Sequence, residues 1–331
     1  MIEANRRNCK SFNVLFTCIG RRVSLLNSFR AAAKELGLSC KFFGTDVTSQ
    51  SAALQLCDKS FVVKSVDHNG YIRQLLRIVR QNNVALIVPT IDLDLYDLAT
   101  YREKFEKLGC RVLVSSPQVV KICQDKRKAY RFMTKNGFET PQTLAARQVL
   151  SKRTIAFPMF LKPWDGYASK GNAIAANRKE LLFYARKIPN CIVQEFVKGE
   201  EYTCDCFVDF DRKIRCVVPR KRIEVRSGEV SKGVTVKNRS IMSKTAELVE
   251  MLGAGPGIIT VQLIYTKDRR IKFIEINPRV GGGLPLSIKA GADFPKWVLA
   301  AVSGVDAQIR FDGFKSRLTM LRYDAEVWVQ G

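Results

Sequence analysis

Val261-Gln262-Leu263 and Phe273-Ile274-Glu275-Ile276-Asn277-Pro278-Arg279 have the pattern of two β-strands joined by the turn Thr266-Lys267-Asp268-Arg269-Arg270. Apolar residues make the strands, and Gln262, Glu275 and Asn277 interrupt them. Glu275 and Asn277 are two residues apart and so share one strand face, which Gln262 can reach from the neighbouring strand. Three oxygen donors on one face predict a site for a hard cation such as Mg2+ or Mn2+. The alternative is an ordinary hairpin with polar residues on its solvent side.

A second candidate site begins where Lys162 ends the apolar strand Phe160-Leu161-Lys162-Pro163. The loop that follows can surround phosphate oxygens with backbone N–H groups and an ammonium, through Gly166, Ser169, Lys170 and Gly171. The loop does not match GxxxxGK[ST] and is therefore not a P-loop. Arg279, two residues beyond the cation-site candidates, carries a planar guanidinium suited to clamp a phosphoryl or carboxylate group. A plain surface loop is the alternative for the glycines and serine.

A third candidate site lies in the segment 192–202, where an apolar strand runs into a turn at Gly199 and out into another strand. The backbone of Glu195, Phe196 and Val197 can present N–H and C=O groups to an adenine edge. Glu201, just past the turn, can bind ribose hydroxyls. A hairpin with an acidic turn is the alternative.

The N-terminal third alternates strands and helices. Residues 13–19 predict a strand that ends at Gly20-Arg21-Arg22, and an amphipathic helix follows as far as Gly37. Strands expected at 39–44, 61–63, 84–88 and 112–114 alternate with helices over 71–80 and on to about Leu108. This order indicates a parallel, doubly wound sheet. The first turn is not GxGxxG, which favours a fold-forming turn over a dinucleotide site.

The pattern changes near residues 115–120. Pro117 opens a helix expected to run to Asn136, and beyond it strands with hairpin turns predominate. Such a run of strands indicates an α+β region. The strands are expected at 157–162, 172–176, 191–197, 202–209, 213–226, 257–265 and 271–276, with helices at about 178–187 and 240–252.

The net charge and the composition favour some classes of partner and of catalysis over others. A net charge of +24 favours anionic partners, either nucleotide phosphate or nucleic acid. The densest basic stretch, Arg212 to Lys232, has no interleaved aromatic residues, so nucleic acid is not expected as a partner. His68, the only histidine, lies in a turn-forming segment, which argues against histidine catalysis. The 10 cysteines contain no CxxC pair and are expected to be reduced thiols.

No run of 18 apolar residues is present, so no membrane span is expected. The first seven residues lack the apolar core of a signal peptide, which predicts a cytoplasmic protein.

Taken in order, the motifs resemble the ATP-grasp superfamily, most of all its carbamoyl-phosphate-synthase-like branch. The resemblance covers roughly residues 10–305. It rests on Asp125-Lys126, the Lys162 strand and loop, 194–202, Val261-Gln262, and Glu275-Ile276-Asn277-Pro278-Arg279. It implies α/β plus α+β architecture: a Rossmann-like pre-ATP-grasp domain at 10–116 and a two-lobed ATP-grasp domain at 117–308. The small lobe would span about 117–192, the large lobe about 193–308, and a C-terminal tail 309–331.

The resemblance also implies roles for individual residues. Lys126 and Lys162 would contact ATP, the loop Gly166 to Gly171 would close over the triphosphate, and Glu195 and Val197 would border the adenine. Glu201 would hold the ribose, and Gln262, Glu275 and Asn277 would carry the metal ion. Arg279 would stabilise an acyl phosphate and, with Lys162, act in catalysis.

The strand 213–226 holds a further candidate pair. Arg220, Arg222 and Arg226 have even spacing and would share a face on a regular strand. The resemblance places the corresponding strand beside the triphosphate, so Arg222 and Arg226 are expected to face the phosphates or an acidic substrate. A solvated sheet edge is the alternative.

The resulting hypothesis is an ATP- and Mg2+-dependent ligase that joins a small-molecule carboxylate to an amine through an acyl phosphate. Carbamoyl-phosphate-synthase-like carboxyphosphate and carbamate chemistry is one alternative, although only one ATP-grasp unit is present. A non-catalytic polyanion-binding protein is another. The sequence leaves open the two substrates and whether the protein forms a homodimer.

Overall fold

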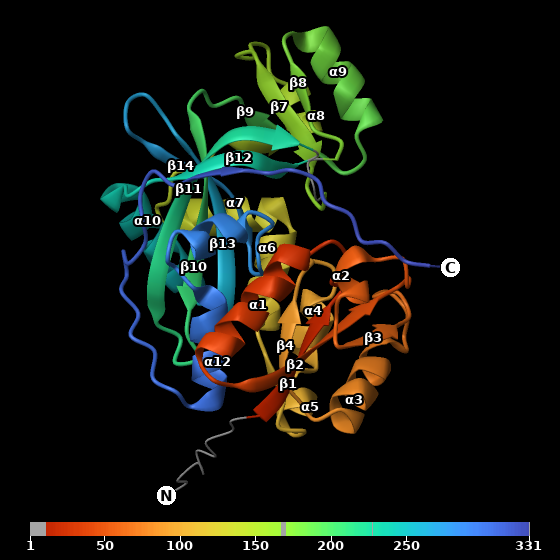
Figure 1. Cartoon of the computed structure of the whole chain (residues 1–331). Coiled ribbons are helices and arrows are strands. Elements are labelled where there is room, and N and C mark those ends of the chain that lie inside the picture. The colour runs from red at the N-terminus through yellow and green to blue at the C-terminus, as the bar shows by residue number, and fades with distance from the viewer. Residues whose placement is uncertain (1–10, 167–169, 227, 331) are drawn as a thin grey trace, which may run out of the picture.

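The structure, a computed structural model, describes residues 11–166, 170–226 and 228–330. It contains three sheets (Figure 1). One belongs to the red-to-orange N-terminal domain, one to the green small lobe at the top, and one to the large lobe that runs from teal to blue. No helix in the described part of the chain is long and apolar enough to cross a bilayer.

The N-terminal domain is a parallel sheet with strand order β3-β2-β1-β4-β5, as the alternating pattern predicts. Because the order reverses between β1 and β4, the loops that follow these two strands open a crevice at the carboxyl edge of the sheet. The loop after β1 contains Arg22, and the loop after β4 contains Asp92. The strands are β1 (Ser11–Thr17), β2 (Ser39–Asp46), β3 (Lys59–Val62), β4 (Val84–Pro89) and β5 (Arg111–Val112). The helices are α1 (Val23–Glu35), α2 (Ala52–Gln55), α3 (Tyr71–Gln81), α4 (Leu95–Thr100) and α5 (Arg102–Glu106).

The single helix expected over residues 117–136 is in fact two, α6 (Pro117–Gln124) and α7 (Lys126–Lys135). Asp125 has an extended backbone, and its side chain accepts hydrogen bonds from the backbone N–H groups of Arg127 and Lys128. An aspartate that caps one helix in this way ends the helix before it. The break matters for function, because the N–H of Lys126 donates to the carbonyl of Trp164 and so holds Lys126 beside the Lys162 strand.

The small lobe is an antiparallel sheet with strand order β6-β9-β7-β8. Its strands are β6 (Thr143–Ala145), β7 (Met159–Pro163), β8 (Ala173–Ala175) and β9 (Cys191–Glu195). Helices α8 (Ala146–Leu150) and α9 (Arg178–Lys187) pack against it around a small core that includes Leu161, Leu181 and Val193. The bounds of α9 agree with the predicted helix, whereas β6 and α8 were not expected.

The large lobe has an antiparallel sheet with strand order β14-β13-β10-β11-β12-β15. Segment 319–321, expected to lie within a tail, adds the edge strand β15 (Thr319–Leu321) to β12. The other strands are β10 (Glu200–Val208), β11 (Ile214–Arg226), β12 (Glu229–Thr235), β13 (Gly257–Tyr265) and β14 (Ile271–Asn277). The helices are α10 (Arg239–Leu252), α11 (Leu284–Lys289) and α12 (Phe294–Ser303).

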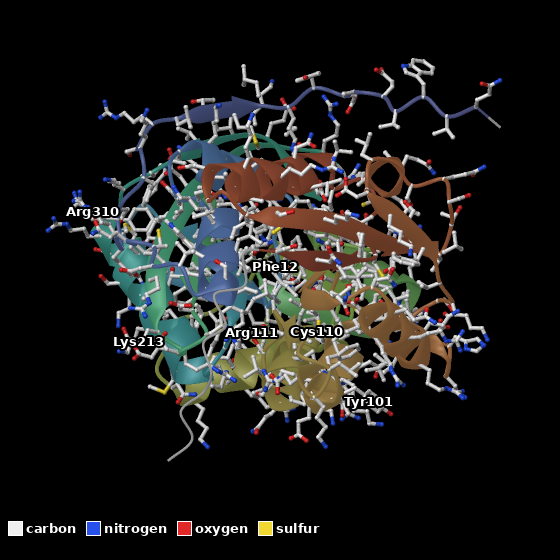
Figure 2. The ribbon with its side chains drawn as sticks, turned by 60° about the horizontal axis from the view of Figure 1, so that its bottom comes forward. Phe12, Tyr101, Cys110, Arg111, Lys213 and Arg310 are labelled. Carbon is white, nitrogen blue, oxygen red and sulfur yellow. The ribbon has the colours of Figure 1, made fainter. Side chains whose placement is uncertain are left out.

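The N-terminal domain and the large lobe share one hydrophobic core, in which Phe16 and Phe29 of the former join the cluster that contains Phe207 and Trp297 of the latter. On the face seen in Figure 2, Arg111 extends this contact. Its guanidinium lies 4.7 Å from the ring centre of Phe210 and donates to the carbonyl of Ala301 at 3.2 Å. The shared core orients the crevice of the N-terminal sheet against the large lobe.

Candidate active site

A cavity of about 680 Å³ lies where the two lobes and the crevice of the N-terminal domain meet. Gly171, expected at the phosphates, does not line it, and Ser169 lies outside the described residues. Most of the residues singled out in the sequence do line the cavity, namely Lys126, Lys162, Gly166, Lys170, Glu195, Phe196, Val197, Glu201, Arg222, Gln262, Glu275, Asn277 and Arg279.

Strand register brings the polar residues of the large lobe into rows. Gln262 on β13 lies opposite Glu275 on β14, and Thr260 lies opposite Asn277. Because directly paired residues in an antiparallel sheet project from the same face, Gln262, Glu275 and Asn277 share the face that lines the cavity. The arrangement agrees with the i, i+2 argument made from the sequence.

Two lysines approach this face from the other side of the cavity. Lys126 Nζ lies 3.6 Å from Glu275 Oε1 and donates to the carbonyl oxygen of Gly166 at 2.5 Å. Lys162 is only 4 % exposed. Burial lowers the pKa of Lys162 to about 8; Lys126 acts in the same direction, while the carboxylates of Glu275 and Glu201 oppose the shift. A polyphosphate that enters the cavity here would add negative charge beside Lys162 and so favour its charged ammonium form.

The segment assigned to adenine also borders the cavity. The backbone N–H of Glu195 donates to the carbonyl of Gln142, and its side chain pairs with Lys272, so neither group is free for a base. Glu195, Phe196 and Val197 all line the cavity at this point. Glu201 lies 3.3 Å from Arg222 Nε, which places a carboxylate and a guanidinium together beside the expected ribose position.

Arg226 departs from the expectation drawn from even spacing. The pairing of β11 with β12 shifts register on both sides of Glu224, and Val225 instead of Arg226 lines the cavity beyond Arg222. The side chain of Arg226 is 68 % exposed and lies 3.7 Å from Asp324. Register irregularities interrupt the two-residue period on which the shared face of Arg222 and Arg226 depended.

Asp92 is a site residue that the sequence analysis missed. Arg279 donates to Asp92 Oδ2 from Nε at 3.0 Å and from Nη2 at 2.6 Å. This ion pair joins the end of β14 to the loop after β4, so the N-terminal domain orients the arginine assigned to the acyl phosphate. The position of Asp92 at the carboxyl end of a predicted parallel strand is the signal that could have identified it.

The loop Gly281–Gly283, which follows Arg279, is a second missed element. A Cβ atom on Gly281 would lie 2.8 Å from Thr260 Oγ1, and one on Gly283 would lie 2.1 Å from Arg220 Nη1. Only glycine fits where a backbone passes this close to side chains. Below the loop, Arg220 and Asp205 form a buried bidentate ion pair that Ser287 extends.

The donor set suits magnesium that binds together with nucleotide phosphates. In the described parts of the chain no group of three or more His, Cys, Asp or Glu side chains gathers at a metal site. Gln262 and Asn277 offer amide oxygens beside the single carboxylate of Glu275. Mg2+ usually takes one or two carboxylates and completes its shell with water and phosphate oxygens. The residues present therefore fit the ion.

Two family models match the chain. Residues 123–283 match the model described as an ATP-grasp domain, and residues 14–113 match that of a PylC-like N-terminal domain. The chain therefore carries an ATP-grasp domain preceded by a PylC-like N-terminal domain, and the ATP-grasp assignment made from the motifs is confirmed.

Curated relatives are distant. The chain is 23 % identical over 259 residues to a carbamoyl-phosphate synthase of Methanobrevibacter smithii, covering 72 % of this chain and 67 % of the relative. It is 25 % identical over 166 residues to a D-alanine–D-alanine ligase of Bacillus anthracis, covering 44 % and 53 % respectively. The chain thus spans about two thirds of the first relative and about half of the second.

Among solved structures, a biotin carboxylase complex from Campylobacter jejuni superposes with a TM-score of 0.73 at 15 % identity. The match covers 94 % of this chain and 75 % of that one. At this level of identity the superposition supports the fold, which agrees with the architecture expected from the sequence.

Proposed function

We propose that this chain, with its ATP-grasp domain behind a PylC-like N-terminal domain, is an ATP- and Mg2+-dependent ligase that joins a carboxylate to an amine through an acyl phosphate. The observation that carries the proposal is the convergence of Lys126, Lys162 and Glu275 in one cavity. Arg279 follows two residues after the end of the strand that carries Glu275. The relative named D-alanine–D-alanine ligase is a ligase, the class of enzyme proposed here.

The nucleotide would bind between the lobes. Glu195, Phe196 and Val197 would border the base, and Glu201 would accept hydrogen bonds from the ribose. Lys126 and Lys162 would bind the phosphates, and the charge of the phosphates would raise the pKa of Lys162 again. Gln262, Glu275 and Asn277 would hold Mg2+, which supplies charge neutralisation on the phosphate oxygens.

The first step requires positioning more than acid–base chemistry. A carboxylate oxygen of the substrate attacks the γ-phosphorus in line, the new O–P bond forms, and ADP leaves. Arg279, held by Asp92, would place its guanidinium beside the developing acyl phosphate. Preorganised donors of this kind commonly account for a large part of the rate enhancement.

In the second step the amine nitrogen attacks the acyl carbon and inorganic phosphate leaves. A neutral amine needs no strong protein base for the attack itself. His68 lies in a turn, where its Nδ1 accepts a hydrogen bond from the N–H of Gly70 at 2.9 Å, and it does not line the cavity.

Hydroxylamine trapping tests the proposal. The protein is incubated with Mg-ATP, hydroxylamine and a panel of carboxylic acids, and hydroxamate and ADP are measured together. A true acid substrate should yield hydroxamate in proportion to ADP. The Glu275→Gln variant should yield neither product, whereas Arg226→Ala, with its exposed side chain, should yield both.

Bicarbonate is a second candidate for the activated acid, favoured by the carbamoyl-phosphate synthase relative. ADP release that depends on bicarbonate, with no hydroxamate from any other acid, would select it. Absence of nucleotide binding would overturn both candidates.

A further inference from the structure

Arg220 has an unused donor at the cavity wall. Its side chain is among the largest fully buried ones of the protein. Nε and Nη2 donate to the two carboxylate oxygens of Asp205 at 2.7 and 2.9 Å. Nη1 is buried and has no hydrogen-bond partner among the described residues, yet Arg220 lines the cavity. A buried guanidinium N–H without a partner costs free energy unless a ligand satisfies it.

Arg22 is a second arginine at this wall, and its neighbourhood carries excess positive charge. Its side chain is 18 % exposed, and Nη1 lies 3.3 Å from Glu229 Oε1. The same carboxylate also lies 3.2 Å from Arg21 and 2.9 Å from Arg322. Three guanidiniums thus share one carboxylate. Arg22 also occupies the N-cap position of α1 without a side-chain capping hydrogen bond, and the first turn of α1 contains no acidic residue, so the helix N-terminus adds to the positive potential.

The loop Gly281–Gly283 brings the two arginines to one place. A Cβ atom on Gly282 would lie 2.7 Å from Arg22 Nη1, and one on Gly283 would lie 2.1 Å from Arg220 Nη1. Arg22 and Arg220 therefore approach consecutive residues of one glycine loop, and all of these residues line the cavity.

This wall is separate from the expected position of the metal ion. In the strand register, Arg220 on β11 lies opposite Thr203 on β10, and Thr203 lies opposite Gln262 on β13. Gln262 in turn lies opposite Glu275 on β14, so these residues form one row across four strands. Three strand spacings of about 4.8 Å put the backbone of Arg220 about 14 Å from that of Glu275. A group bound at Arg22 and Arg220 would therefore lie next to the glycine loop that follows Arg279, several strands away from the carboxylate of Glu275.

We propose that Arg22 and Arg220 form a subsite for an acidic group, a carboxylate or a phosphate, which one of the two ligase substrates carries in addition to its reacting group. The inference rests on the proposed ligase function and specifies its substrate class. Arginine suits the role because its guanidinium stays charged when buried and binds both kinds of anion.

Matched substrate pairs test the subsite. The full chain is assayed for ADP release with aspartate against asparagine, glutamate against glutamine, and O-phosphoserine against serine, each with a pool of amines and of acids. At least one acidic member should have a KM about tenfold or more below that of its neutral counterpart, as expected for a charge-assisted hydrogen bond. The carboxylate and phosphate arms identify which acidic group the subsite takes.

Arg22→Gln should abolish this preference, and Arg21→Gln is the matched control. Arg21 contacts the same carboxylate, and Arg21→Gln removes the same charge as Arg22→Gln. The side chain of Arg21, however, is 72 % exposed and does not line the cavity. Because Arg220→Gln would leave Asp205 buried without its partner and could prevent folding, Arg22→Gln carries the test. Equal KM values within all pairs, or equal losses in the Arg21 and Arg22 variants, would overturn the subsite.

Calorimetry separates this inference from the ligase proposal. The preferred acidic compound is titrated into protein saturated with Mg2+ and a non-hydrolysable ATP analogue. Binding that weakens about tenfold in Arg22→Gln supports the subsite even if no acyl phosphate is ever trapped. If the protein binds the ATP analogue and forms an acyl phosphate normally but does not discriminate between acid and amide, the subsite proposal is wrong. The ligase proposal is unaffected by that result.

Discussion

Arg279 donates two hydrogen bonds to a single oxygen of Asp92, from Nη2 at 2.6 Å and from Nε at 3.0 Å, although 187 positions separate the two residues in the chain. The pair connects the strand that carries Glu275 and Asn277 to the N-terminal domain. Both side chains are largely shielded, with exposures of 17 % and 23 %. The N-terminal domain therefore helps to hold Arg279 in place at the wall of the cavity.

We expect Asp92→Asn to lower kcat about tenfold while leaving the affinity for an ATP analogue unchanged. An amide can still accept a hydrogen bond, but it lacks the charge that fixes the guanidinium, and small misplacements of a positioning group slow the chemical step. The control is Glu139→Gln, which breaks an exposed ion pair with Arg270 elsewhere on the surface. Steady-state kinetics and calorimetry measure both quantities, and an unchanged kcat in Asp92→Asn would contradict the role.

Glu275→Gln should reduce ATP turnover more than about 100-fold, because the amide cannot neutralise a cation or pair with Lys126. The fold should survive, since the side chain lines a cavity and does not belong to the core. ADP release and circular dichroism report the two effects. Glu247→Gln, on the exposed face of α10, is the matched control. Turnover near that of the unaltered protein, with normal Mg2+ dependence, would remove Glu275 from the site.

Lys162 should make nucleotide binding depend on pH. Burial lowers its pKa to about 8, and bound phosphates favour the charged form, so the pKa must be higher in the complex than in the free protein. Between the two values binding takes up a proton, and the affinity falls as the pH rises above about 8. Calorimetry in two buffers of different ionisation enthalpy measures the uptake. Lys162→Arg, which stays charged, should abolish it; equal uptake in that variant would assign the proton to another group.

Arg222→Ala should weaken ATP or acid binding by about 1–3 kcal/mol, the usual value of a charge-assisted hydrogen bond, whereas Arg226→Ala should change neither. Arg222 has a side-chain exposure of 9 % and lines the cavity, while Arg226 is exposed and does not. Michaelis constants for ATP and acid distinguish the two variants. Equal changes in the Michaelis constants of the two variants would contradict the prediction that Arg222 contacts the ligand and Arg226 does not.

Local patterns predicted much of the site because strand geometry is local. The two-residue period that groups Glu275 with Asn277 needs only a regular strand, and the pairing with Gln262 needs only a short turn. The same rule failed at Arg226, since the register shifts around Glu224 arise in the pairing with β12. The helix expected over 117–136 was wrong for a related reason: apolar periodicity continues through Asp125, whereas the capping hydrogen bonds of its side chain divide the helix.

The sequence by itself determined the alternation of strands and helices in the N-terminal domain, the ATP-grasp motifs and the residues that meet on the β13–β14 face, because each depends on neighbours along the chain or across one turn. Only the tertiary structure decided which partners hold the arginines. Asp92 with Arg279 and Arg22 with Glu229 each join the N-terminal domain to the large lobe. Asp205 with Arg220 depends on the register between two strands. The physical reason is that a charged side chain pairs with whichever opposite charge packing brings within hydrogen-bond distance, and no sequence period encodes that proximity.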